Sequence, residues 1–219
     1  MTPDTVSVPA DRVTLDGDFA VPASARAVVL LPHGVDNSRQ NRRSQSIATE
    51  LHTAGFATLL VDLLSESEKR RDRQPGEQRF DVGLLARRIV ATVDWATIQP
   101  ATRSLPVILF GAGAEADAVL GASADLPERV LTVVVWGARP DPTADAVKRV
   151  RVPVLFIAGG QDTALLRLAE ETVHHMEGPH SVRTVPEATH LFEEEGALDQ
   201  VITTAREWCD EQLRAAPEA

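Results

Sequence analysis

The stretch Leu105–Leu120, LPVILFGAGAEADAVL, decides the fold of this chain. It begins with an apolar run, passes through a turn with two glycines, FGAGAE at 110–115, and continues in a segment of helical composition. A strand that is apolar on both faces is typical of a parallel sheet covered by helices. The stretch therefore predicts a strand, a sharp turn and a helix in an α/β protein.

Further apolar runs repeat this pattern along the chain and alternate with segments of helical period. The expected strands lie at 27–32, 56–62, 105–110, 130–136, 152–159 and 181–186, and the expected helices at 42–54, 81–98, 114–122, 164–176 and 198–215. Near the start, two short β-rich segments at 13–15 and 18–21 flank an Asp-Gly pair, which predicts an antiparallel hairpin. The charged stretch at 65–79 predicts a solvated loop. Together these features predict one doubly wound, mostly parallel α/β domain over residues 1–219.

Composition narrows the classes of partner. The chain has 22 Lys and Arg against 32 Asp and Glu, a net charge of −10, which argues against nucleic acid and anionic membrane surfaces as partners. A single cysteine, Cys209, and the lack of an apolar leader or membrane-length run favour a reduced cytoplasmic setting. Neither a dinucleotide fingerprint nor an NTP-binding loop is present, so we expect no cofactor and a small-molecule ligand or substrate.

Residues able to carry chemistry follow the ends of the expected strands. His33 follows the run at 27–32, Gly113 follows 105–110, Asp162 follows 152–159, and His190 follows 181–186. The order of a glycine turn, an acid and a histidine along the chain is that of one known class of catalytic triad. We therefore expect Asp162 and His190 to form a pair at the carboxyl edge of the sheet.

With the motifs LLPHG, ILFGAGAEA, VPVLFIAGGQDT and ATHLFEEEG, the chain resembles the α/β-hydrolase superfamily, and within it the small dienelactone hydrolase branch that has no large lid. The resemblance implies that Asp162 is the acid and His190 the base. It places Gly113 at the position of the nucleophile. It also implies an oxyanion hole made by the backbone N–H groups of Val35 and Ala114.

Gly113 departs from the family pattern because it has no hydroxyl, thiol or carboxylate with which to form a covalent intermediate. Glycine adopts positive φ at little steric cost, so the turn could keep its shape. Glu115 also replaces the usual small residue, and its carboxylate is a candidate acid or base. Three functions stay open: an enzyme without a covalent intermediate that uses His190 and Asp162, a non-catalytic ligand-binding protein, and an ordinary ester or lactone hydrolase whose serine has been replaced at 113.

Three residues near the LLPHG motif are candidate pocket residues. Arg39 could bind a substrate carboxylate, or it could belong to the solvated basic start of a helix. Asp62, at the end of its strand, could contact the same region or simply end the strand. His33 is interpreted chiefly as a turn-forming residue.

Other nucleophiles and metal ligands are less convincing. Ser123 lies well into the helix after the turn, about 15 Å from it at the helical rise, and Cys209 lies in the last helix. His174, His175 and His180 lack a convergent geometry and carboxylate or cysteine partners, so we expect no metal site.

Overall fold

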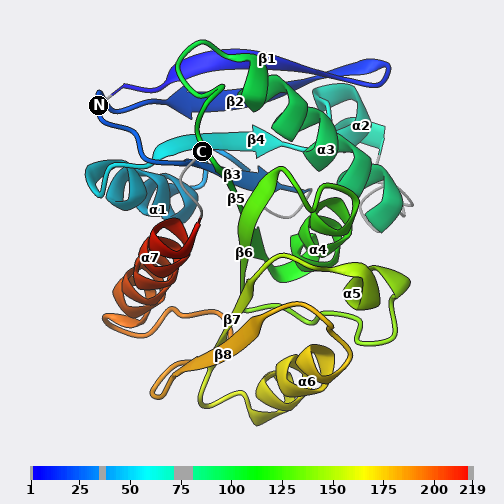
Figure 1. Ribbon diagram of the computed structural model, residues 1–219, viewed down its shortest axis with the longest axis vertical. Coiled ribbons are helices and arrows are strands. Elements are labelled where there is room, and N and C mark those ends of the chain that lie inside the picture. Colours follow the sequence, from blue (N-terminus) through cyan, green and yellow to red (C-terminus); the bar gives the residue numbers. More distant parts are fainter. Residues whose placement is uncertain (1, 35–37, 72–80, 217–219) are drawn as a thin grey trace. The chain divides into compact units, whose positions relative to one another are not determined.

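The computed structural model describes residues 2–34, 38–71 and 81–216 of the chain (Figure 1). The chain divides into two compact units, residues 1–107 and 108–219, and each is described by itself. The expectation of a single domain stays a prediction.

The first unit has four strands in the order β1-β2-β4-β3. Strand β1 pairs with β2 and β2 with β4 in antiparallel fashion, whereas β3 and β4 are parallel. Helix α1 lies on one side of these strands and α3 on the other (Figure 1). The elements are β1 (Asp4–Ala10), β2 (Val13–Ala20), β3 (Val28–His33), α1 (Arg42–Thr53), β4 (Ala57–Asp62), α2 (Glu66–Arg71) and α3 (Val82–Ile98).

An antiparallel N-terminal strand pair exists, but the residues predicted for it are wrong: the segments at 13–15 and 18–21 both belong to the region of β2, and its partner β1 was not predicted. Ala10 pairs with Val13, so the turn lies at residues 11–12, and Asp11 has a φ of 50° there. The Asp-Gly pair at 16–17 lies inside β2. A Cβ on Gly17 would come within 3.0 Å of a β4 side chain, so the glycine serves close strand contact and not a turn.

The predicted loop at 65–79 is wrong over its first part, since helix α2 begins at Glu66. Ser65 N–H donates to Glu68 Oε2 at 2.9 Å, and Glu68 N–H donates to Ser65 Oγ at 3.4 Å. This reciprocal pair is a capping box, whose S-x-x-E pattern is visible in the sequence beneath the mixed charge. Residues 72–80 lie outside the described residues.

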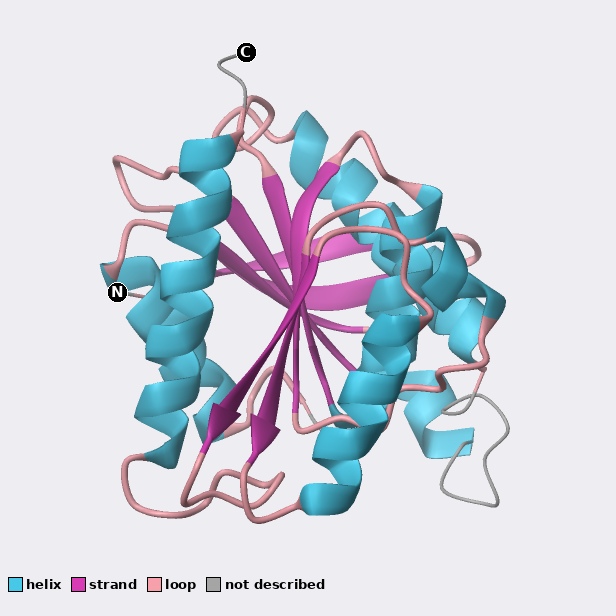
Figure 2. Ribbon diagram, turned by 60° about the horizontal axis from the view of Figure 1, so that its bottom comes forward, coloured by secondary structure: helices cyan, strands magenta, loops and turns pink. Residues whose placement is uncertain are grey.

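The second unit has four strands in the order β5-β6-β7-β8, with β6, β7 and β8 parallel. Helix α7 covers one face, and α4 and α6 cover the other (Figure 1). Figure 2 shows this layering, with helices on both faces of the strands. The elements are β5 (Val107–Ala112), a 3₁₀ turn η2 (Gly113–Glu115), α4 (Ala116–Asp125), β6 (Val130–Trp136), α5 (Asp145–Arg149), β7 (Val154–Gly159), α6 (Thr163–His174), β8 (His180–Val185) and α7 (Ala197–Ala215).

Close packing in the second unit holds α4 against the last residues of β5. A Cβ on Gly111 would lie 2.4 Å from the Val119 side chain, so only glycine lets α4 pack this closely on β5. Phe110 and Trp136 form an edge-to-face pair at 5.8 Å between β5 and β6. The turn after β5 therefore projects from a rigid base. Among the helices in the described part of the chain, none is both long and apolar enough to cross a lipid bilayer.

Candidate active site

The two residues predicted from the sequence as acid and base, Asp162 and His190, lie in contact in the structure. His190 Nδ1 lies 2.7 Å from Asp162 Oδ2, and the two side chains are 39% and 21% exposed. Asp162 is also the N-cap of α6, because Leu165 N–H donates to its Oδ1 at 3.3 Å. One carboxylate thus caps a helix and contacts the imidazole. This geometry suits a histidine whose other ring nitrogen accepts a proton.

The loop that carries His190 connects β8 to α7 over residues 186–196, and we call it the histidine loop. Two glycines at the ends of β6 and β7 let it approach the strands. A Cβ on Gly137 would lie 2.4 Å from the His190 carbonyl oxygen, and a Cβ on Gly159 would lie 2.4 Å from the Thr189 carbonyl group. The sequence interpretation missed both roles, although each glycine stands at a strand end.

Glu194 is a second residue of the histidine loop that the sequence interpretation missed. Its Oε1 accepts a hydrogen bond from Thr189 N–H at 3.0 Å. Hydrogen bonds from the Thr189 backbone and hydroxyl lower the pKa of Glu194 below its usual value. Glu194 therefore acts as a carboxylate acceptor for the backbone of Thr189, the residue before His190.

Gly113 occupies the first position after β5 with a φ of +56°. Within the described residues, a Cβ built there would meet no atom within 4 Å. Ala114 follows in the exposed 3₁₀ turn, whereas Glu115 is 7% exposed. The turn thus has a left-handed backbone conformation that favours glycine, and the expected nucleophile position stays a prediction. Val35, the other expected oxyanion-hole residue, lies outside the described residues.

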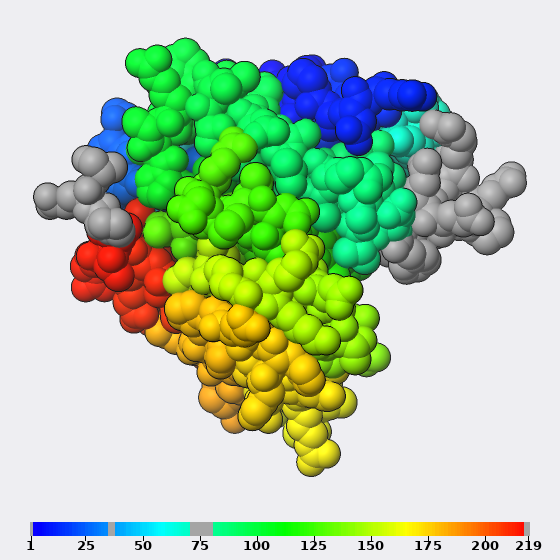
Figure 3. Space-filling view, turned by 45° about the vertical axis from the view of Figure 1, so that its right-hand side comes forward, coloured from blue at the N-terminus to red at the C-terminus, as the bar shows by residue number. Residues whose placement is uncertain are grey.

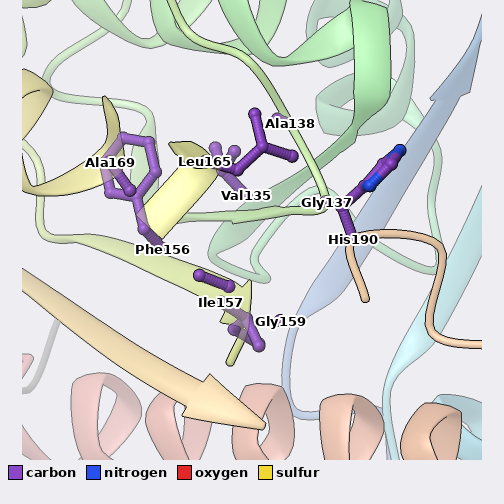
Figure 4. A pocket seen from close by; sticks show the side chains of 10 residues that line it. Val135, Gly137, Ala138, Phe156, Ile157, Gly159, Leu165, Ala169 and His190 are labelled. Carbon is purple, nitrogen blue, oxygen red and sulfur yellow. The ribbon is translucent and has the colours of Figure 1, made fainter. Parts of the chain in front are cut away.

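A pocket lies beside His190 in the second unit (Figure 4). Its cavity volume is about 10 Å³, which is room for about one water molecule. Helix α6 contributes Leu165 and Ala169, the ends of β6 and β7 contribute most of the remaining lining, and His190 is the one titratable residue among the described residues that line it. Figure 3 shows α6, in yellow, at the molecular surface. The pocket is therefore a small, mostly apolar gap beside His190, too small to enclose a substrate molecule.

Arg39 and Asp62, two of the predicted residues of the first unit, belong to a partly buried charge cluster. Arg39 Nη1 lies 2.7 Å from Asp18 Oδ1, and Arg39 N–H donates to Asp62 Oδ1 at 3.0 Å. Lys69 Nζ donates to Asp62 Oδ2 at 2.9 Å. Arg39 precedes α1 and is not part of a solvated helix start, because its guanidinium has carboxylate partners within the chain. Asp18 and Lys69 were not predicted from the sequence.

The prediction that His33 forms a turn is wrong. His33 is the last residue of β3 and lies opposite Asp62 of β4. Its side chain is buried, and within the described residues its Nε2 has no hydrogen-bond partner. Burial lowers the pKa of His33 from 6.5 to about 4, while Asp62 raises it and Lys69 lowers it further. The ring is therefore neutral at pH 7.

The alternative nucleophiles are both buried. Ser123 Oγ donates to the Leu120 carbonyl at 2.8 Å inside α4, and Cys209 is fully buried in α7. His175 and His180 each contact a backbone carbonyl close to themselves in the chain. Over residues 2–34, 38–71 and 81–216, no three His, Cys, Asp or Glu side chains are grouped so that they could hold a metal ion.

Curated relatives cover this chain almost entirely. A Mycobacterium tuberculosis protein, found in strains H37Rv and CDC 1551, is named as a phosphoribosyl transferase and is 40% identical over 210 residues. The match covers 96% of this chain but 46% of that protein. The chain therefore spans about half the length of the curated relatives it matches.

Solved structures show the same fold. A dienelactone hydrolase from Anabaena variabilis has a TM-score of 0.91 and 39% identity, with 96% of this chain and 99% of that chain covered. Est1E from Butyrivibrio proteoclasticus has a TM-score of 0.77 and 16% identity, with 96% and 99% covered. The expected α/β-hydrolase fold, with a mostly parallel sheet, an antiparallel N-terminal strand pair and no large lid, is confirmed.

The family model named dienelactone hydrolase family matches residues 15–213. This match covers most of the chain, with parts of both units and the residues Asp162 and His190. Together with the relatives above, it shows that this chain belongs to the dienelactone hydrolase family.

Proposed function

We propose that this protein uses His190 as a general base on a small organic molecule and forms no covalent intermediate with it. The observation that carries the proposal is the 2.7 Å contact between His190 Nδ1 and Asp162 Oδ2. Such a contact keeps the proton on Nδ1 and leaves Nε2 as the acceptor. Asp162 also stabilises the imidazolium that forms when Nε2 takes a proton.

Gly113 supports chemistry of this kind over acyl transfer. In a serine hydrolase, loss of the nucleophile costs on the order of 10⁶ in turnover. What this site retains is a base and, at Ala114, a backbone N–H in a turn before a helix, where negative charge is favoured. Such a set suits proton abstraction, addition, elimination or cyclisation.

The surroundings of His190 bear on the substrate class. The cavity beside it, about 10 Å³, is too small to enclose a molecule, so a substrate would lie in the open beside His190. The mostly apolar residues there favour a small, largely apolar molecule with one acidic proton. The M. tuberculosis relatives are named as transferases, but this chain spans 46% of their length, so we do not propose a transferase activity for it.

A single-base reaction tests the proposal most directly, and 5-nitrobenzisoxazole is a suitable probe. His190 Nε2 would take the C3 proton, the N–O bond would break, and the electron pair would leave on the phenolate oxygen as the nitrile forms. The product absorbs visible light, so turnover is followed directly. No nucleophile and no cofactor is needed.

We expect His190→Ala to lower kcat/KM for this probe by about 10²-fold or more, the usual contribution of a general base. His175→Ala is the matched control, because His175 is an exposed histidine at the end of α6. Equal rates for His190→Ala and the wild type would refute the proposal that His190 is the general base. If the wild-type protein turns over neither this probe nor small esters yet binds them, the ligand-binding function holds instead.

Restoring a nucleophile gives a second arm of the same test. Because a Cβ at 113 meets no atom of the described residues within 4 Å, Gly113→Ser should fold, at a cost of about 1–3 kcal/mol for a non-glycine residue at positive φ. We expect it to hydrolyse p-nitrophenyl acetate at least about 10²-fold faster than Gly113→Ala, which has the same backbone strain without the hydroxyl. Equal rates for the two variants would mean that the remaining machinery is not competent for acyl transfer.

A further inference from the structure

We propose that Glu194 is a positioning residue that holds His190 in contact with Asp162 by anchoring the preceding peptide of the histidine loop. The inference rests on the proposed function, because it assigns His190 the role of base. Glu194 Oε1 accepts the hydrogen bond of Thr189 N–H at 3.0 Å. Thr189 and His190 share a peptide bond. A fixed Thr189 backbone therefore limits the positions that the His190 backbone, and with it the imidazole, can occupy.

The loop needs such an anchor because its conformation is unfavourable by itself. Phe192 has a φ of +49°, which is unusual for a bulky residue, and its side chain is 2% exposed. Strained backbone persists only where surrounding contacts over-determine it. Phe192 N–H donates to the Thr189 carbonyl at 3.2 Å, so both backbone groups of Thr189 are engaged.

Thr189 is confined from the strand side as well. A Cβ on Gly159 would clash with the Thr189 carbonyl group at 2.4 Å, and a Cβ on Gly137 would clash with the His190 carbonyl oxygen at 2.4 Å. Gln161 N–H also donates to the Ala188 carbonyl at 3.0 Å. The histidine loop is therefore held against β6 and β7 on one side and by the Glu194 carboxylate within the loop itself.

The state of Glu194 fits a role beyond ordinary loop packing. Hydrogen bonds from Thr189 hold its pKa below the usual value, so the carboxylate is ionised and the bond to Thr189 is charge-assisted. Its Oε2 is buried and has no hydrogen-bond partner within the described residues. Burial of an unpaired carboxylate oxygen opposes folding, which argues that Glu194 is not there for stability alone.

Neighbouring glutamates provide a matched control. Glu193 and Glu195 are both exposed, whereas Glu194 is half-buried. Glu195→Ala and Glu195→Gln change the same charge in the same loop without touching Thr189. Glu194→Ala removes the acceptor, and Glu194→Gln keeps an acceptor oxygen but loses the charge.

Two readouts need no turnover and therefore separate this inference from the proposed function. The first is hydrogen exchange at the Thr189 amide. We expect Glu194→Ala to lower its protection about tenfold or more, since a charge-assisted bond is lost, and Glu194→Gln to lower it less. The second is the NMR signal of the His190 Nδ1 proton, for which Asp162→Asn provides the reference spectrum without the normal partner.

We expect the Nδ1 signal to broaden or shift toward the Asp162→Asn position in Glu194→Ala, to be partly rescued in Glu194→Gln, and to be unchanged in both Glu195 variants. Turnover of 5-nitrobenzisoxazole should then fall in kcat more than it changes KM. Unchanged Thr189 exchange, or a His190 signal equal in the Glu194 and Glu195 variants, would overturn the proposal. If Glu194→Ala does not fold, the comparison of Glu194→Gln with Glu195→Gln decides in the same way.

Discussion

At the scale of single residues, the burial of His33 makes the stability of the folded protein depend on pH. It ends β3 in a buried position beside Asp62, and burial lowers its pKa to about 4. In the unfolded chain its pKa returns to about 6.5. Between these two values the unfolded state binds more protons than the folded state, so stability rises with pH in this window.

We expect the free energy of unfolding to fall by about 3 kcal/mol through His33 alone as pH drops from 6.5 to 4, at about 1.4 kcal/mol per unit of pKa. Urea unfolding at pH 7, 5.5 and 4.5 measures this. His33→Gln is the comparison, because it keeps a polar side chain that does not titrate. If the wild type and His33→Gln lose stability in parallel across this range, the assignment to His33 is wrong.

Residue 113 has a backbone conformation that favours glycine, with a φ of +56°. Within the described residues, a Cβ added there would meet no atom within 4 Å. The comparison of Gly113→Ser with Gly113→Ala therefore tests the proposed nucleophile position, because both variants carry the same backbone strain and only one adds a hydroxyl.

At the scale of elements, a buried ion pair joins α2, α3 and the end of β4. Arg88 Nη2 lies 2.6 Å from Glu68 Oε1, and Arg88 Nη1 donates to Glu68 Oε2 at 3.0 Å and to the Leu63 carbonyl at 2.6 Å. Both side chains are almost fully buried. Burial raises the pKa of Glu68, but hydrogen bonds from Arg88 and Ser65 outweigh it and lower the pKa below the usual value.

Glu68→Gln should destabilise the protein by about 3 kcal/mol or more, because it leaves the Arg88 guanidinium buried without its counter-charge. The control is Asp125→Asn, which breaks the exposed pair with Arg149 and should cost less than about 1 kcal/mol. Chemical denaturation compares the two variants at pH 7. A cost for Glu68→Gln as small as that of Asp125→Asn would show that the pair does not hold α2 to α3.

At the scale of the whole molecule, charge sets the behaviour in solution. The net charge is −10 at pH 7, and the isoelectric point is about 5.1. Mutual repulsion keeps such molecules apart at neutral pH and disappears near pH 5. The same pH interval is where the protonation of His33 weakens the fold.

We therefore expect light scattering from concentrated protein to rise as pH falls from 7 toward 5. His33→Gln should shift the onset to lower pH, since only the charge effect remains. Scattering that stays flat through pH 5 in both proteins would contradict this. A rise that is identical in both would assign the effect to net charge alone.

Much of the architecture was readable from the sequence. The long apolar runs predicted the strands β3 to β8 because buried parallel strands need apolar residues on both faces. Helical periods located α1, α3, α4, α6 and α7 to within a few residues. The errors came from local signals: the Asp-Gly pair at 16–17 predicts a turn but lies inside β2, and the mixed charge at 65–79 conceals the capping box of α2. The short helix α5 was not predicted.

By itself, the sequence determined the fold class, the family resemblance and the kinds of side chain available for chemistry, because these depend on hydrophobic pattern and motif order. Only the tertiary structure decided which groups touch. The 2.7 Å contact of His190 with Asp162 and the pairing of Arg39 with Asp18 join residues far apart in the chain. The physical reason is that such contacts depend on how distant segments approach each other. The histidine loop, for example, approaches β6 and β7 at Gly137 and Gly159, where what matters is the absence of a side chain.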